Sequence, residues 1–205
     1  MFKTGELILD HGPEQKFRFE LAPVVGDAIH NLRTALDLTW YEFLDHHAPA
    51  AISDHTSFPV RKTRQGVIAA LGNAEIKRLG SRLFDLIVSD LQPYKGGQGE
   101  IIYSLHELDI RDKHMLLLPI FEVATITMDI EDDRQNVSEF YVIRTRGREI
   151  SPTRFPPGYK LKDKGKPSIN VVFDKGVPMH TEPIVPALRR FVKTTRGIVE
   201  RFETY

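Results

Sequence analysis

The sequence predicts an α+β fold: an N-terminal strand pair, a four-helix bundle-like core, a C-terminal antiparallel sheet and a final helix that packs back on the bundle. Two observations predict it. The first half of the chain spaces its apolar residues at helical intervals, and the region that follows contains stretches rich in β-branched and aromatic residues. Helices that precede strands in this way are typical of α+β folds. We expect the 205 residues to form a single compact domain, with a helical part at about 22–116, a strand-rich part at about 117–180 and a final helix at about 181–204.

The N-terminal strand pair is predicted at residues 5–10 and 16–22, on either side of a turn-like HGPEQ. Phe17 and Phe19 alternate with charged residues, which is the pattern of a half-buried strand. The strand pair would therefore lie ahead of the first helix.

The helical part is predicted to begin at Pro23, since proline suits the first turn of a helix. An apolar stripe from Val25 to Phe43 indicates an amphipathic helix of about six turns that ends near Pro49. Three more helices are predicted, at residues 64–71, 73–91 and 100–114.

The strand-rich part is predicted to contain strands at residues 121–130, 139–145 and 168–173. The sequence DDRQN at 132–136 is typical of a turn between the first two. Thr181 and the residues after it are a reasonable start for the final amphipathic helix.

The composition narrows the classes of function. There is no cysteine, which excludes disulfides, thiolate nucleophiles and cysteine-ligated zinc. Twenty-eight basic residues balance twenty-eight acidic ones, so any nucleic-acid-binding surface would have to be local. Neither an apolar signal segment nor a membrane-length apolar run is found, and we expect a cytoplasmic protein without a membrane partner. The common nucleotide-binding and serine-hydrolase motifs are absent, and no cofactor is expected.

Polar residues flank the core faces of two predicted helices. On a helical wheel, His30, Arg33 and Asp37 share an arc of about 60° beside the apolar stripe of the first helix. Asp109 and Asp112 lie within or beside the apolar face of the fourth helix. Because carboxylates in a core are costly unless paired, we expect the two helices to pack through a network that joins His30 and Arg33 to the two aspartates.

Two interpretations of this network stay open. It is either a structural ion-pair clip, for which one arginine and two aspartates are sufficient, or an acid–base site in a cleft. Lys113 and His114 belong to the same group of candidates. His114 lies at a helix-to-strand junction, where functional side chains are common, but a histidine near a helix C-terminus is also favoured by the helix dipole alone.

No metal site is predicted. His46 and His47 are adjacent and would point about 100° apart on a helix, and no zinc-ligand spacing occurs. A metal site, if one existed, would combine His30, His106 or His114 with Asp37, Asp109 or Asp112.

A local basic segment runs from Arg144 to Lys166, with eight basic residues against two acidic ones. Basic side chains beside exposed aromatics are typical of a single-strand nucleic-acid surface, although a solvated loop explains the same composition. The candidate nucleic-acid-binding residues are Arg144, Arg146, Arg148, Arg154, Phe155, Tyr159, Lys160 and Lys162. Basic residues of the final helix, such as Arg189 and Arg196, would support the nucleic-acid interpretation if they faced the same way.

The motifs HNLRTALD, FPV, LQPY and LHELDIRDKHMLLL together resemble a widespread bacterial and phage family of uncharacterised proteins, over roughly residues 22–120. The resemblance implies motif positions at His30, Asn31, Arg33, Asp37, Asp109, Asp112, Lys113 and His114, and no reaction. Leu38 stands where that family usually has a histidine, so a site that used the histidine would be incomplete here. The helical part is also similar in architecture to HEPN-type ribonucleases, but Arg111 and His114 are too close in sequence for the motif of those enzymes.

Two functions follow as hypotheses. The favoured one is a binding or interaction protein whose His/Arg/Asp network is mainly structural. The alternative is a nucleic-acid-directed protein, for instance a metal-independent nuclease in which His114 or His30 acts as acid–base and Arg33 and Lys113 stabilise phosphate charge. The sequence leaves the partner and the oligomeric state open, a homo-oligomer included.

Overall fold

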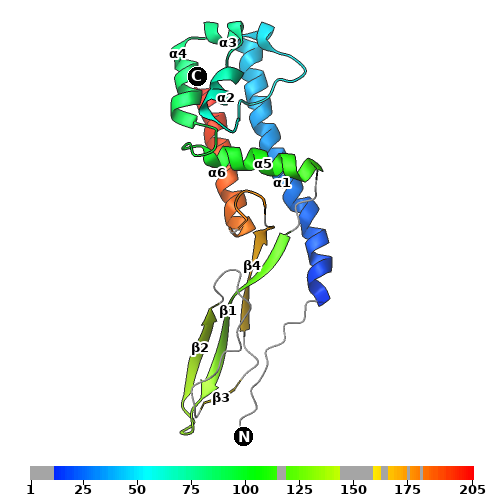
Figure 1. The fold of residues 1–205 in the computed structure, drawn as a ribbon, viewed down its shortest axis with the longest axis vertical. Coiled ribbons are helices and arrows are strands. Elements are labelled where there is room, and N and C mark those ends of the chain that lie inside the picture. The colour runs from blue at the N-terminus through cyan, green and yellow to red at the C-terminus, as the bar shows by residue number, and fades with distance from the viewer. Residues whose placement is uncertain (1–11, 115–118, 144–158, 163–165, 175, 181) are drawn as a thin grey trace.

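The structure is a computed structural model, which describes residues 12–114, 119–143, 159–162, 166–174, 176–180 and 182–205. A helical body lies at one end, and a sheet extends away from it (Figure 1). The helices are α1 (Gly12–His47), α2 (Arg64–Ala70), α3 (Ala74–Arg78), α4 (Ser81–Phe84), α5 (Glu100–His114) and α6 (Ile184–Glu203), with a 3₁₀ turn η1 (Pro49–Ala51) and a π-helix η2 (Asp85–Leu91). The strands are β1 (Pro119–Glu131), β2 (Val137–Ile143), β3 (Lys160–Leu161) and β4 (Lys166–Phe173). The predicted α+β class is therefore confirmed.

The predicted strand at residues 16–22 is wrong, because these residues belong to α1. Seven residues are too few to separate a period of two from a helical period, and Phe17 and Leu21 are also one helical turn apart. Pro23 lies inside the helix rather than in its first turn. The other strand of the predicted pair, residues 5–10, lies outside the described residues.

The single helix predicted at 73–91 is divided into α3, α4 and η2. Gly80 separates the first two with a φ of +84°, a left-handed conformation that glycine adopts easily. The π-helix ends at Gln92, which is also left-handed with a φ of 47°, directly before Pro93. The chain is therefore interrupted once, at Gly80, within the segment predicted as one continuous helix, and that segment ends at Gln92–Pro93 as predicted.

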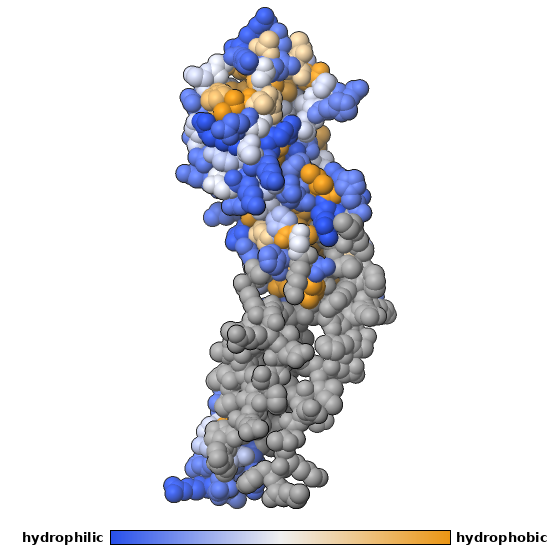
Figure 2. Space-filling view, viewed as in Figure 1, coloured by the Kyte–Doolittle hydropathy of each residue, from blue (hydrophilic) through white to orange (hydrophobic). Residues whose placement is uncertain are grey.

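The core of the helical body contains aromatic contacts between the first helix, α1, and the last helix, α6. The Trp40 ring of α1 meets the Phe202 ring of α6 edge-on, with 6.0 Å between centroids, and Phe43 meets the same ring at 5.1 Å. Phe58, in the loop after α1, is fully buried against both Trp40 and Phe202. In the view of Figure 2, the described residues of the helical body present a mainly hydrophilic surface with scattered apolar residues. The final helix thus packs back on the helices, as predicted.

The sheet is antiparallel throughout and is organised around β1. β2 pairs with the second half of β1 across a turn at Asp132, while β4 and the short β3 pair with β1 as well. The three predicted strands are confirmed, and β3 is an addition. At the helical end of the sheet, Phe173 of β4 is buried in the common core, and Val172 forms an isolated β-bridge with Pro183 just before α6.

Candidate functional site

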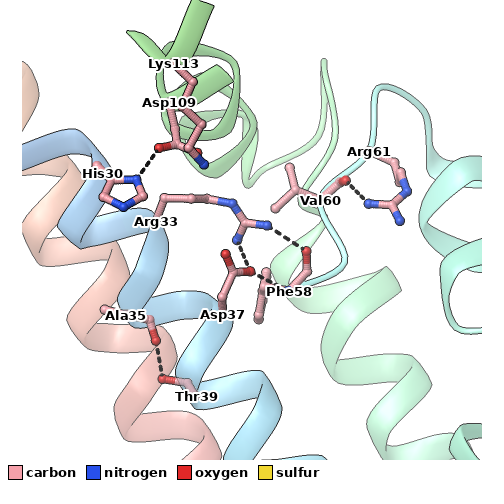
Figure 3. A network of polar contacts seen from close by, with 10 residues as sticks. All are labelled: His30, Arg33, Ala35, Asp37, Thr39, Phe58, Val60, Arg61, Asp109 and Lys113. Atoms are coloured by element: carbon pink, nitrogen blue, oxygen red, sulfur yellow. Dashed lines mark hydrogen bonds and ion pairs between the residues drawn. The ribbon is translucent and has the colours of Figure 1, made fainter. Parts of the chain in front are cut away.

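The predicted polar residues meet where α5 lies across α1 (Figures 1 and 3). His30, Arg33 and Asp37 are spaced by three and four residues on α1, which places them on one flank of that helix. Asp109 and Lys113 are four residues apart on α5 and face them. The packing of the two core helices therefore creates the cluster.

Asp109 is the buried acceptor of the cluster, with 3% of its surface exposed. Its Oδ1 lies 2.9 Å from Nδ1 of His30, and its Oδ2 accepts a hydrogen bond of 2.7 Å from Nζ of Lys113. The side chains of His30 and Lys113 are each about half exposed. A carboxylate that would be costly to bury alone is thus satisfied from both sides.

Arg33 is the other buried charge, with 4% of its surface exposed. Its Nη2 donates to the backbone oxygen of Phe58 at 3.2 Å, and its Nη1 lies 2.9 Å from Oδ1 of Asp37, an ion pair without hydrogen-bond alignment. Asp37 in turn accepts a 2.8 Å hydrogen bond from the N–H of Phe58. The arginine and the aspartate therefore hold both polar groups of one buried residue's backbone, as Figure 3 shows.

The prediction for Arg33 was incomplete. We expected it to meet the aspartates of α5, but its hydrogen bond goes to the loop after α1. Sequence reasoning missed Phe58 as a partner because a backbone carbonyl has no signature in the side-chain sequence; its place in the FPV motif was the available signal.

Burial governs the ionisation of this pair. It lowers the pKa of the Arg33 guanidinium, against the opposing charges of Asp37 and Asp109. It also raises the pKa of the Asp37 carboxyl, against the Arg33 charge and the Phe58 N–H. Each group thus stabilises the charged form of the other.

His106 lies behind the cluster on α5. Its Nδ1 is buried and has no hydrogen-bond partner among the described residues. Burial, followed by the charge of Arg33, lowers the pKa of His106 to about 4. The imidazole is therefore neutral at pH 7, and burial of its neutral form is compatible with the neighbouring arginine.

Asp112 reaches α1 at another point. A Cβ atom added to Gly26 would overlap the Asp112 carboxylate. Glycine at this position of α1 therefore lets the carboxylate approach the helix backbone, one turn before His30. Asp112 thus lies against α1, but at Gly26 and not, in the contact shown here, at His30 or Arg33 as predicted.

The remaining candidates lie apart from the cluster. Asn31 and His114 are exposed, the latter at the end of α5. Tyr159, Lys160 and Lys162 are exposed at the far strand β3, where Nζ of Lys162 lies 3.5 Å from Oε2 of Glu131. Arg144, Arg146, Arg148, Arg154 and Phe155 lie outside the described residues.

The described residues form neither a metal-ligand cluster nor a membrane span. No group of three or more histidine, aspartate or glutamate side chains is arranged to hold a metal ion there. None of the helices in that part of the chain has the length and apolarity needed to span a membrane.

Two pockets on the described surface lie elsewhere, and neither is lined by residues of the cluster. The larger, about 590 Å³, lies between the first half of α5 and the start of α6. The second lies between α4, η2 and the C-terminal residues. His30, Arg33 and Asp109 thus line neither of these two pockets.

Comparison of the chain with protein-family models, with curated proteins and with solved structures gave no match. The family resemblance carried by the motifs stays a prediction.

Proposed function

We propose that the chain is a binding or interaction protein in which the His/Arg/Asp cluster is a structural clip. One observation carries this proposal: both buried charges, Arg33 and Asp109, have their partners within the chain. Buried pairs of this kind fix how helices pack, because removing one partner leaves an uncompensated charge. A cytoplasmic location, suited to a chain without cysteine, is part of the same proposal.

The experiment compares folding with catalysis. Wild type, His30→Ala and Arg33→Met are assayed for cleavage of RNA, single-stranded DNA and bis-p-nitrophenyl phosphate, and their unfolding by urea is followed by circular dichroism. A clip predicts no cleavage by any of the proteins and a lower free energy of unfolding for Arg33→Met. Cleavage by wild type that is lost in a folded His30→Ala variant would overturn the proposal.

A second candidate function is a nucleic-acid-directed hydrolase. It is favoured by the hydrogen bond between buried Asp109 and Nδ1 of His30, which leaves the other ring nitrogen of a half-exposed histidine for acid–base chemistry. Lys113 would supply positive charge beside it. The basic segment 144–166 would hold the strand, with His114 as the alternative acid–base group.

Binding measurements test this second candidate separately. Affinity for a fluorescent single-stranded oligonucleotide is measured against salt concentration for wild type and for the triple variant Arg144→Gln, Arg146→Gln, Arg148→Gln. A basic-segment interface predicts a smaller salt slope in the variant, by about 0.7 for each phosphate that the segment no longer neutralises. Equal slopes would exclude the segment, and cleavage unaffected by His114→Ala and His30→Ala would exclude both histidines.

A further inference from the structure

The pocket between α5 and α6 combines charge with apolar walls. Three carboxylates and two basic side chains, Lys95 and Arg190, line it, together with apolar side chains that include Ile101, Val177 and Met179. Its volume of about 590 Å³ lies within the range of small-molecule sites, about 300–1,000 Å³. None of its lining residues belongs to the clip.

One face of α5 supplies most of its polar groups. Glu100, Tyr103, Ser104 and Glu107 follow one another at intervals of three, one and three residues, so they share a stripe along the helix. The third carboxylate, Glu182, is already paired, since its Oε2 lies 3.0 Å from Nη2 of Arg190. Glu100 and Glu107 form no ion pair within the part of the chain that the structure describes.

Tyr103 reports the electrostatic character of this stripe. Burial raises the pKa of its phenol, and the negative charge of Glu107, a hydrogen bond to it and the charge of Glu100 raise it further. Burial disfavours any charge at this place, whereas the two carboxylates favour a cation over an anion there.

Ser104 gives the second, independent sign of a ligand. Only 8% of its surface is exposed, and it lines the pocket. Its hydroxyl has no hydrogen-bond partner among the described residues. Its Oγ is open to the space of the pocket, so a polar group that enters there would find a hydrogen-bond partner in it.

We propose that this pocket binds a small organic ammonium ion. The Glu100 and Glu107 carboxylates neutralise the cation, and the Ser104 hydroxyl accepts a hydrogen bond from one of its N–H groups. Ile101 and Met179 contact its hydrocarbon part. A primary amine fits best, since it offers N–H donors that a quaternary ammonium lacks. The inference rests on the proposed binding role but uses a different site, so the two can fail independently.

Isothermal titration of the full chain at low salt tests the proposal. The probe is 1,4-diaminobutane, and the neutral 1,4-butanediol is its matched control. We expect saturable binding of the diamine and none of the diol. Glu107→Gln and Glu100→Gln should each weaken diamine binding about tenfold, which corresponds to the loss of one charge-assisted hydrogen bond, and Ser104→Ala about fivefold.

Two further variants separate this site from charge effects elsewhere. Glu203→Gln removes an exposed carboxylate of α6 that lies outside the pocket lining and should leave the affinity unchanged. His30→Ala should leave it unchanged too, and its cleavage assay tests the clip by itself. The proposal is overturned if diamine and diol bind alike, if neither binds, or if Glu203→Gln weakens the diamine as much as Glu107→Gln does.

Discussion

The two polar regions of α5 differ in how their buried groups are satisfied. Toward its C-terminal end, the Asp109 carboxylate receives two partners from the chain itself. Toward its N-terminal end, Ser104 is also buried but has no partner within the described residues, and it faces a pocket. Polar residues beside a core are therefore poor evidence of a site on their own. The two regions differ because the chain supplies a partner to each oxygen of Asp109, whereas no described residue bonds to the Ser104 hydroxyl.

The largest effect is expected at Arg33, whose carboxylate partner is one-third exposed and whose other partner is the backbone of fully buried Phe58. Arg33→Ala removes one of the two donors to the Phe58 carbonyl, which keeps the Val60 N–H, and it leaves the Asp37 carboxylate without its counter-charge. It also opens a cavity beside a fully buried residue. We expect the free energy of unfolding to fall by about 3–5 kcal/mol. Urea unfolding followed by circular dichroism measures it.

Asp109→Ala is the matched comparison for Arg33→Ala. It removes the other buried charge, but its partners His30 and Lys113 are half exposed and can be solvated by water, so the loss should be only about 1–2 kcal/mol. If Asp109→Ala lowered the free energy of unfolding as much as Arg33→Ala, the exposure of the partner residues would not determine the size of the loss.

A smaller effect is expected from acid. The pKa of His106 is about 4 in the folded protein and ordinarily 6.5, so the unfolded chain binds more protons between these values. The free energy of unfolding should therefore fall as the pH is lowered from about 6.5 to about 4, by ~1–2 kcal/mol after allowance for partial exposure. His106→Gln should remove this part of the pH dependence.

Two variants, His106→Gln and His55→Gln, are needed to assign the pH dependence to His106. The raised pKa of Asp37 acts in the opposite direction, because the folded state then holds that proton more tightly and gains stability as the pH falls through its titration. Only the difference between wild type and His106→Gln therefore isolates the histidine. His55→Gln, at an exposed position, should keep the wild-type profile; an unchanged profile in His106→Gln would contradict the prediction.

Gly26→Ala tests the close approach of α5 to α1. Alanine would ordinarily stabilise a helix relative to glycine by about 1 kcal/mol, but here the new methyl group meets the Asp112 carboxylate. We expect a net loss of about 1 kcal/mol. The double variant with Asp112→Ala should recover the helix-propensity gain, and additive effects in this cycle, measured by urea unfolding, would contradict the contact.

The sequence was informative where local spacing determines structure. The apolar stripe from Val25 to Phe43 predicted the buried face of α1, and the positions of His30 and Asp109 beside two core faces predicted their meeting. Spacing failed where a window was short, as at residues 16–22, and where one glycine decided the path of the chain, as at Gly80. A helical pattern tolerates a glycine, and only its backbone conformation shows whether the helix stops there.

The rest of the site depended on tertiary structure. The bond from Arg33 to the Phe58 carbonyl involves an acceptor that every residue has, so no residue type marks it. The pocket requires the segment before α6 to return beside α5, a placement set by β4 and not by any local pattern. The spacing of Glu100, Ser104 and Glu107 was visible in the sequence, but without the opposite wall it describes only a solvated helix face.

The smallest effect should come from Ser104→Ala, and it sharpens the comparison most. Since the hydroxyl has no partner within the described chain, its removal breaks no hydrogen bond there, while alanine favours the helix. The free energy of unfolding should stay the same or rise by about 0.5 kcal/mol, although diamine binding weakens. A fall in stability of about 1 kcal/mol or more, measured by the same urea unfolding, would mean that the chain itself satisfies this hydroxyl. Ser104 would then be part of a second structural clip, and the chain would supply hydrogen-bond partners to the buried polar groups at both ends of α5.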